Sequence, residues 1–370
     1  MRRVLFWMHL GAGVLVSALV LYFSITGALL AYERPILQAA DRRFYKAEPI
    51  PQSGAPLSLD TLVAGAITAL PPPVEMLTLH HDAQMPVEIL AANRSVYFVN
   101  RYTGIVEGPV SPRVRNFFAT VTALHRWFGL SAAHHAAATA VKGVVALLFA
   151  FLLLSGLILW MPASWKRSSL RRGMVPRFDG SGRARNYNWH KVTGFWTGLP
   201  LGIIAFTGLI MAYPWANAQL FRLAGSPLPP RGPENANARR HGVGMHASPT
   251  HLDEGFAEAT RGVQDWQTTT LRLPTGEKEM SFTVDRSEGG HPDKREQVSV
   301  DAKTLLVLHR EPFTALSRGQ RWRNWVRFAH TGEAGGWWGE SLALMSACGA
   351  MLLSVTGVVL SFDRMRRWLR

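Results

Sequence analysis

Residues 9–32 read HLGAGVLVSALVLYFSITGALLAY, and residues 190–213 read HKVTGFWTGLPLGIIAFTGLIMAY. In both stretches a histidine is followed by Gly after 4 residues, by Thr-Gly after 17 and 18, and by Ala-Tyr after 22 and 23. Each stretch exceeds the roughly 20 apolar residues that a helix needs to cross a bilayer. This agreement along two apolar spans indicates that the chain carries the same unit twice.

The elements around these two spans repeat as well. Two further apolar windows end in Ser-Gly and Thr-Gly, at residues 155–156 and 356–357, and His125 and His330 precede them. The repeating unit is therefore a span, an outer segment, a histidine and a second span. Both units begin on the same side of the membrane, so we expect a parallel repeat whose axis lies along the membrane normal.

The positive charge of the chain falls mainly beside the spans. The 370 residues include 40 Lys and Arg against 25 Asp and Glu, a formal net charge of +15. Basic residues concentrate before the first span, in the loop 162–189 and in the tail 363–370. Because short basic loops stay in the cytoplasm, we expect both termini there. The charge thus indicates topology and contact with the lipid bilayer, and without an accompanying motif it argues against a nucleic-acid partner.

We therefore predict an α-helical membrane protein, a four-helix transmembrane bundle built from a tandem parallel repeat, with two small α+β periplasmic domains. In each domain a short helix (57–70 and 251–263) should precede a small antiparallel sheet, which the alternating residues 86–107 indicate in the first. The expected segments are transmembrane helices at 1–32, 136–161, 190–213 and 337–362, periplasmic domains at 33–135 and 214–336, the cytoplasmic loop 162–189 and the tail 363–370.

Four histidines are the candidate ligands. In the four-span topology His9 and His190 lie level near the cytoplasmic ends of their spans, and His125 and His330 lie level at the periplasmic ends. Ionisable residues in spans are costly and usually functional, and a neutral imidazole is a common metal ligand. Two level imidazoles on facing helices suit bis-histidine ligation of haem iron. A single histidine at the end of a span is otherwise often only an interfacial polar residue.

The glycines of the repeat fit the same hypothesis. Gly13 and Gly194 follow their histidines by one helical turn, so a missing side chain there leaves room for a flat macrocycle. Gly27 and Gly208 lie farther along the same face and are expected to flank a second haem. The competing interpretation is close helix packing through small residues.

Other residues leave alternatives open. His134 and His135 begin the second span and are possible substitutes for His125. His241, His246 and His251 favour an exposed loop over a metal site. Basic and aromatic residues outside the second and fourth spans form either an interfacial belt or a rim for an anionic substrate; they are Arg113, Arg115, Phe117, Phe118, Arg126, Trp127, Arg321, Trp322, Arg323, Trp325, Arg327, Trp337 and Trp338.

Several classes of site are excluded by composition and motif. A single cysteine, Cys348, rules out an intrachain disulfide framework and a Cys-ligated zinc or iron–sulfur site. The chain has no dinucleotide fingerprint after a strand, no P-loop, no H-E-x-x-H and no G-x-S-x-G motif. The cytoplasmic segments are too short for a flavin or nicotinamide domain, so electrons would come from the quinone pool or a separate donor.

The same residues carry a resemblance to a known family. The run L-His125-R-W, the later S-G-L-I-L-W ending at Trp160, and W-H-x-x-x-G around His190 resemble the PepSY-associated transmembrane family over essentially the whole chain. The strand pattern V-x-V-[ND]-x-x-T-G-x-V resembles PepSY repeats in the outer domains, although Leu305 stands where the first copy has Gly104.

The resemblance implies a bacterial inner-membrane protein with two haem b per chain, and it carries the axial ligand roles onto His9, His190, His125 and His330. It further implies an enzyme that reduces periplasmic ferric-siderophore to Fe(II), with electrons from a quinol or a reductase. Reduction weakens chelation by hard oxygen ligands and frees the iron. The alternative is a non-redox PepSY membrane module that binds or regulates a periplasmic protease or peptide.

Overall fold

The computed structural model describes residues 1–45, 54–70, 73–162, 165–229, 250–273 and 279–368. The chain divides into two compact units. One contains Met1–Glu33, Phe117–Leu223 and Trp322–Arg370, and the other contains Arg34–Asn116 and Ala224–Arg321. We call them the bundle unit and the sheet unit and describe each by itself.

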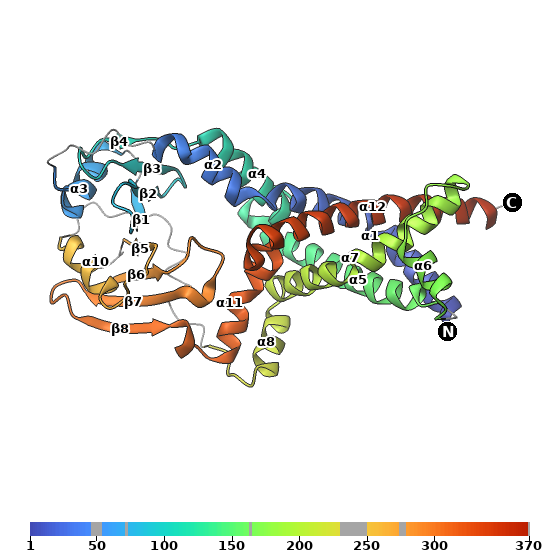
Figure 1. Ribbon diagram of the computed structural model, residues 1–370. Helices are drawn as coiled ribbons and strands as arrows, with labels where there is room; N and C mark the ends of the chain where they lie inside the picture. The colour runs from blue at the N-terminus through green and yellow to red at the C-terminus, as the bar shows by residue number, and fades with distance from the viewer. Residues whose placement is uncertain (46–53, 71–72, 163–164, 230–249, 274–278, 369–370) are drawn as a thin grey trace. The chain divides into compact units, whose positions relative to one another are not determined.

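Four long helices form the bundle unit (Figure 1). They are α1 (Arg2–Leu30), α5 (His135–Trp160), α7 (Gly182–Ala212) and α12 (Gly336–Trp368). α1 packs against α5 and α12, and α7 packs against the same two helices, so α1 and α7 lie diagonally across the bundle. Within the described residues all four lie in helical segments long and apolar enough to cross a membrane, which confirms the four expected spans.

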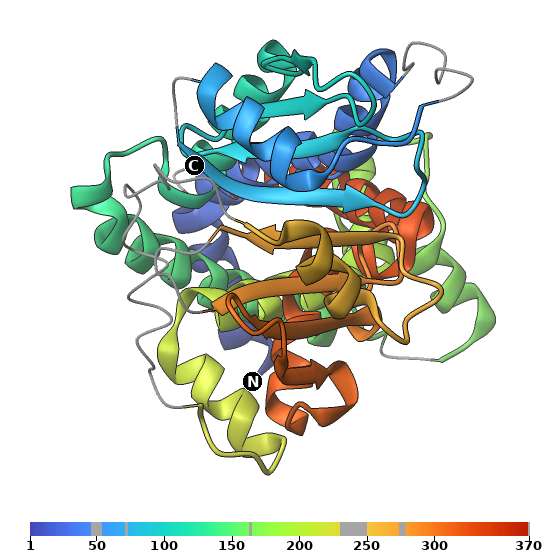
Figure 2. The same ribbon diagram turned by 90° about the vertical axis from the view of Figure 1, so that its left-hand side faces the viewer.

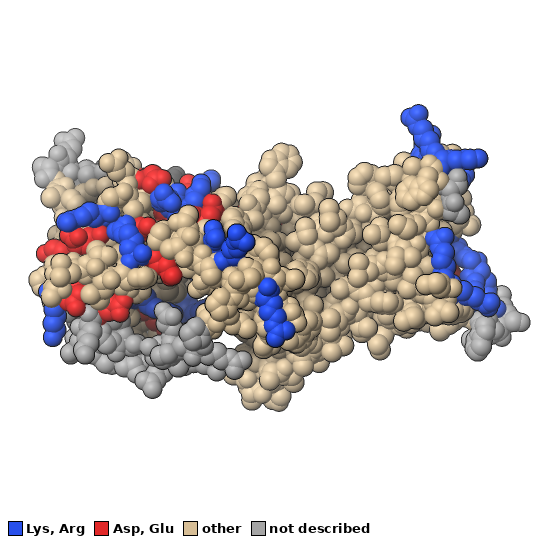
Figure 3. Space-filling model, turned by 90° about the horizontal axis from the view of Figure 1, so that it is seen from below, with Lys and Arg blue, Asp and Glu red and all other residues tan. Residues whose placement is uncertain are grey.

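The outer surface of these helices is apolar, as a lipid-facing surface requires. Leu15, Leu154 and Leu199 are 72 %, 66 % and 78 % exposed in the chain alone. A helix satisfies its backbone hydrogen bonds internally, which is why such a segment is stable in hydrocarbon. Charged side chains gather instead at the end of the bundle where both termini lie, beyond a long stretch without charge on the face seen in Figure 3.

Small residues bring the bundle helices together. A Cβ atom on Gly143 of α5 would lie 2.2 Å from the ring of Tyr213, and one on Gly349 of α12 would lie 2.5 Å from Thr197. These contacts therefore need glycine. The chain also contains shorter helices: α2 (Glu33–Tyr45), α4 (Pro112–Trp127), α6 (Arg167–Met174), α8 (Pro214–Leu223) and α11 (Arg318–Thr331).

The sheet unit contains one antiparallel sheet in the order β4-β3-β2-β1-β5-β6-β7-β8. α3 (Leu59–Ala69) and α10 (Leu252–Thr260) cover one face (Figure 2), and their apolar sides join the buried core around Leu77, Ile89 and Phe282. The strands are β1 (Val74–His80), β2 (Val87–Ala91), β3 (Val96–Val99), β4 (Val106–Glu107), β5 (Thr268–Arg272), β6 (Glu279–Asp285), β7 (Arg295–Asp301) and β8 (Val307–Pro312).

The sheet is continuous where the sequence analysis expected two small separate sheets. β1 pairs with β5, with Thr78 opposite Thr270, and the two hydroxyls lie 3.1 Å apart. Each of these strands would otherwise present an edge of unpaired backbone groups. Pairing them satisfies both edges and merges the two sets of four strands into one sheet.

The two covering helices cap each other. The backbone N–H of Leu59 donates to Oδ2 of Asp253 at 2.8 Å, and the N–H of Leu252 donates to Oδ1 of Asp60 at 3.1 Å. Each carboxylate thus satisfies a free N–H in the first turn of the other helix. Burial raises the pKa of Asp253, with its two backbone bonds acting in the opposite direction.

Replacing Asp253 by Ala should lower the free energy of unfolding of the sheet unit by about 1 kcal/mol, because a partly buried backbone N–H of the first helical turn loses its acceptor. Asp60→Ala should have a similar effect. Thermal unfolding of the full chain in detergent, followed by limited proteolysis of the sheet unit, measures this. The exposed Asp265→Ala variant is the control, and equal melting of all three variants would refute the role of the caps.

Candidate functional site

His9 and His190 meet inside the bundle from its two diagonal helices. Their ring centroids lie 6.5 Å apart and the ring planes cross at 89°. His9 lies in the third turn of α1, and His190 lies in the third turn of α7. The structure therefore brings together the two residues that the repeat pairs by level.

Each of these imidazoles is held by a hydroxyl from a neighbouring helix. Nδ1 of His9 lies 2.8 Å from Oγ of Ser155 on α5, and Nδ1 of His190 lies 2.9 Å from Oγ1 of Thr356 on α12. The glycine after each hydroxyl residue lies under the ring. A Cβ atom there would approach Cε1 to 3.3 Å for His9 and 3.4 Å for His190.

The second pair has the same setting. His125 ends α4 and His330 ends α11, and the two imidazoles are close enough to interact electrostatically. Nδ1 of His125 lies 2.8 Å from Oγ1 of Thr26, and Nδ1 of His330 lies 3.0 Å from Oγ1 of Thr207. The next residues are again glycines, and a Cβ there would approach the Cε1 atoms to 3.5 and 3.3 Å.

The hydroxyl hydrogen atoms determine which imidazole nitrogen carries a proton. Each hydroxyl donates to the carbonyl one turn before it in its own helix, at 2.6 Å from Ser155 to Phe151 and 2.6 Å from Thr356 to Leu352. The corresponding bonds of Thr26 and Thr207 are 3.0 and 2.7 Å long. With its one hydrogen committed, each hydroxyl accepts from Nδ1–H.

Nε2 of each histidine then keeps a free lone pair. His330 has an additional acceptor that fixes the same tautomer, because its Nδ1 lies 3.0 Å from the carbonyl of Ile204 and a carbonyl can only accept. Metal-binding histidines commonly have this arrangement, in which the second ring nitrogen donates to an oxygen and orients the ring. All four imidazoles are therefore prepared to ligate a metal through Nε2.

The spacing of the first pair would allow both imidazoles to bind one metal ion. An imidazole nitrogen bonds a first-row metal at about 2 Å and its ring centroid lies about 1 Å farther, so two imidazoles on one metal would have ring centroids up to about 6 Å apart. The observed distance is 6.5 Å. In the described part of the chain no three His, Cys, Asp or Glu side chains gather around one point. The protein would therefore supply two imidazole ligands at this level, from His9 and His190.

The two pairs lie at different levels of the bundle. Thr26, which holds His125, follows His9 by 17 residues in α1. At 1.5 Å per residue this separates the two levels by about 25 Å along the helix. That length is close to the roughly 30 Å of a hydrocarbon core.

The glycines divide into two kinds. Gly27 and Gly208 lie beside the rings of His125 and His330, since a Cβ atom there would meet Cε1 of each ring. Gly13 and Gly194 face equivalent leucine side chains instead, and a Cβ there would lie 3.9 Å from Leu152 and 3.6 Å from Leu353.

The remaining histidines lie in other settings. His135 stacks on Trp127 with centroids 4.2 Å apart, and Nδ1 of His134 lies 3.1 Å from the hydroxyl of Ser131. It is His125 that interacts with His330. His251 is exposed, with Nδ1 3.9 Å from Glu254, and His241 and His246 lie outside the described residues.

Parts of the two basic and aromatic clusters have structural partners. Arg115 forms an ion pair with buried Asp41, and Arg327 lies 3.4 Å from Glu333. Arg126 lies over the ring of Trp127, 4.4 Å from its centroid. Arg323 is largely desolvated, which lowers its pKa.

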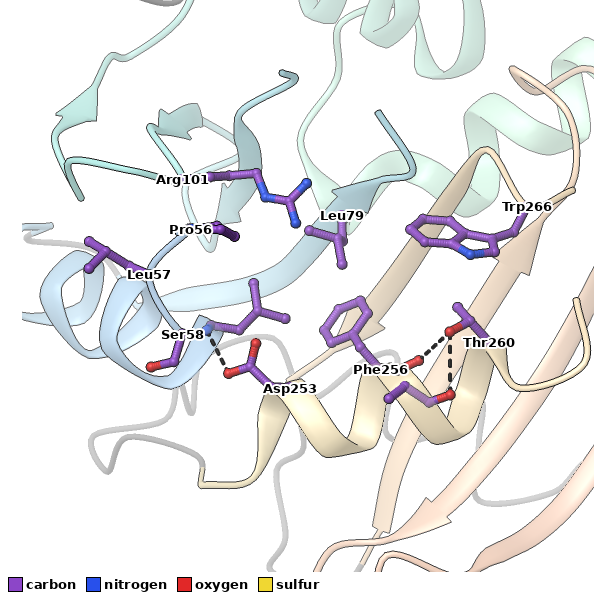
Figure 4. A pocket seen from close by; sticks show the side chains of 11 residues that line it. Pro56, Leu57, Ser58, Leu79, Arg101, Asp253, Phe256, Thr260 and Trp266 are labelled. Carbon is purple, nitrogen blue, oxygen red and sulfur yellow. Dashed lines mark hydrogen bonds between the residues drawn. The ribbon is translucent and has the colours of Figure 1, made fainter. Parts of the chain in front are cut away.

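The sheet unit has a pocket of its own, of about 360 Å³, between α3 and α10 (Figure 4). Arg101 and Trp266 reach towards it from two sides, and Asp253 lies beside the cap of α3. Leu79 and Phe256 supply apolar lining. An open pocket with one cation, one carboxylate and an aromatic ring could bind a small polar ligand.

The hydroxyl residues were missed as functional by the sequence analysis. The signal was present, because a Ser-Gly or Thr-Gly dipeptide occurs in each of the four spans. It was used only to mark the repeat. Recognising its role required the partner helix, since each hydroxyl is between 99 and 166 residues away from its histidine.

The four apolar helices define a multi-span membrane protein whose bundle contains two histidine pairs. A family model described as the PepSY-associated TM region matches residues 6–364, and the chain belongs to this family. Among curated proteins none matches the sequence.

Replacing Thr26 by Val should release the tautomer of His125, because that ring then has no acceptor that fixes Nδ1–H. Thr207→Val should leave His330 in the Nδ1–H form, because the carbonyl of Ile204 remains. ¹⁵N NMR of the protein labelled at histidine, prepared without any cofactor, measures the tautomers. The same response in both variants would contradict the assignment.

Proposed function

We propose that the protein is an inner-membrane di-haem b electron-transfer protein that reduces periplasmic ferric-siderophore and releases Fe(II). His9 and His190 would hold one haem and His125 and His330 the other. The observation that carries the proposal is the shared setting of the four imidazoles, each with Nδ1 bound to a hydroxyl and Nε2 left for a metal.

Haem, when bound, supplies a one-electron Fe(III)/Fe(II) couple at each histidine pair. The chain's own residues prepare the site for it. The hydroxyls of Ser155, Thr356, Thr26 and Thr207 hold the neutral tautomer and fix the ring direction, and the following glycines let the rings lie against the helix backbone. Apolar side chains such as Val16, Val145 and Leu201 fill the space between the two levels and exclude water.

The two levels support transfer across the membrane. Sites about 25 Å apart along α1 lie towards opposite faces of a hydrocarbon core of roughly 30 Å. We infer that the chain is a tandem parallel repeat, since each half supplies one imidazole to each pair. We also propose that the two outer domains are PepSY-like.

Orientation follows from charge. The loop 162–189 and the C-terminal tail are rich in Arg and Lys, which favours a cytoplasmic location for them and for both termini. The sheet unit would then be periplasmic. An electron would enter from a quinol or a reductase near the His9 level and leave near the His125 level.

The substrate step is a one-electron reduction. Each Fe(III) held by a siderophore takes up one electron supplied by the donor and becomes Fe(II). Fe(II) binds hard oxygen ligands more weakly, so the metal is released without a general acid or base from the protein.

An optical spectrum of the detergent-purified protein tests the haem content. We expect a Soret band, sharp α and β bands after reduction by dithionite, and about two haem b per chain by pyridine haemochrome. His125→Ala and His330→Ala should each remove one haem and leave the other. His134→Ala is the control, because that residue bonds only to Ser131 in the described structure, and it should retain both haems.

A colourless wild-type protein, even after haem supplementation, would reject the proposal. The non-redox alternative, a PepSY membrane module that binds a periplasmic protease or peptide, would then lead. Full haem content in both His125→Ala and His330→Ala would reject the pairing alone.

Reduction of ferric-siderophore by the dithionite-reduced protein, measured with a ferrous chelator under anaerobic conditions, tests the activity. The His330→Ala variant should lose at least tenfold in rate, because the site nearest the proposed periplasmic side is lost. Wild-type protein that holds two haems but transfers no electron to any ferric-siderophore would refute the substrate assignment.

A further inference from the structure

Lys142 is a charged residue of the bundle that the proposed mechanism leaves unused. It lies in α5, half-buried, and its Nζ donates to the carbonyl of Arg126 at 3.3 Å. Its charge acts on both His125 and His330. The lysine therefore lies beside the second histidine pair.

No carboxylate neutralises this lysine in the part of the chain that the structure describes. Besides its desolvation, the charged group that acts on Lys142 is another cation, Arg126. A desolvated cation is costly unless an anion pairs with it. Among the described residues Lys142 thus has a backbone carbonyl as its hydrogen-bond acceptor and no carboxylate bonded to it.

The other half of the chain shows that the bundle does not need this charge. Ser155 and Thr356 bind equivalent histidines in the two halves of the chain. Lys142 precedes Ser155 by 13 residues, and the residue that precedes Thr356 by 13 residues is Ala343. Helix packing at that position is therefore compatible with a methyl group. The lysine is thus present in one half of the chain, and alanine stands at the corresponding position of the other half.

We propose that Lys142 binds a carboxylate of the ligand held by His125 and His330, namely a propionate group of the haem. The inference rests on the proposed function and extends it to the acidic edge of the macrocycle. The carboxylate neutralises the lysine, and the lysine in turn favours the reduced iron, which carries one positive charge less.

The loss of haem to excess apomyoglobin tests this binding. Lys142→Met keeps most of the side-chain volume and removes the charge, so we expect one of the two haems to dissociate at least tenfold faster. Lys142→Arg should restore slow dissociation. Lys191→Met is the matched control, because Lys191 follows His190 and so lies at the other histidine pair. Its Nζ lies 5.9 Å from the ring centroid of Trp160. In this variant the haem held by His125 and His330 should dissociate at the wild-type rate.

A second measurement does not depend on activity. Without haem the lysine has no carboxylate bonded to it among the described residues, so Lys142→Met should melt at a higher temperature than the wild-type apoprotein. With haem bound the order should reverse. A purely structural lysine would destabilise both forms when replaced.

Three outcomes decide the matter. Wild-type protein that binds no haem ends the proposed function itself. Wild-type protein with two haems, together with Lys142→Met that releases both at wild-type rates, overturns only the role of Lys142. Stabilisation of the wild-type apoprotein by phosphatidylglycerol vesicles, lost in Lys142→Met and exceeding that given by haem, would assign the lysine to a lipid phosphate and also overturn it.

Discussion

One hydrogen bond, from imidazole Nδ1–H to a serine or threonine hydroxyl, constrains the bundle more than any other contact. The hydroxyl can accept because its own hydrogen goes to the carbonyl one turn earlier. The residue must therefore lie within a helix, and a glycine follows it in each case, where a Cβ atom would come within 3.3–3.5 Å of the ring. Each bond also joins two helices: α1 to α5, α7 to α12, α4 to α1 and α11 to α7.

The part of the fold that depends on local composition could be predicted from the sequence. Four apolar stretches of sufficient length predict four spans, and the family resemblance was confirmed as well. The continuous sheet could not be predicted, because the pairing of β1 with β5 joins residues such as Thr78 and Thr270, which are 192 positions apart. Neither strand has a local sequence feature that identifies the strand it pairs with. The alternation of apolar and polar residues in each strand fits two separate small sheets equally well.

The site was predictable to a similar extent. Histidines in apolar surroundings are rare enough to be noticed, and matching offsets paired His9 with His190 before their distance was known. The hydroxyl partners and the contact of Gly27 with a histidine ring depend on the crossing of helices. Helix periodicity predicted the face of the helix on which Gly27 lies, but it could not predict which ring lies beside that glycine. That ring belongs to His125, which is 99 residues away from Thr26 in the sequence and lies in another helix.

A chain with two matching halves contains its own comparison. Positions where the halves agree, such as the hydroxyl and glycine beside each histidine, report what both pairs need, namely an oriented neutral imidazole. Positions where the two halves differ indicate how the surroundings of one histidine pair differ from those of the other. The half that carries Lys142 has its counterpart in Ala343, and the half that carries Lys191 has its counterpart in Leu10. Each histidine pair therefore has one lysine nearby that the other half of the chain does not repeat. Lys191 lies by an aromatic ring, whereas Lys142 lies by a carbonyl and another cation, so the two pairs hold identical imidazoles in different electrostatic surroundings.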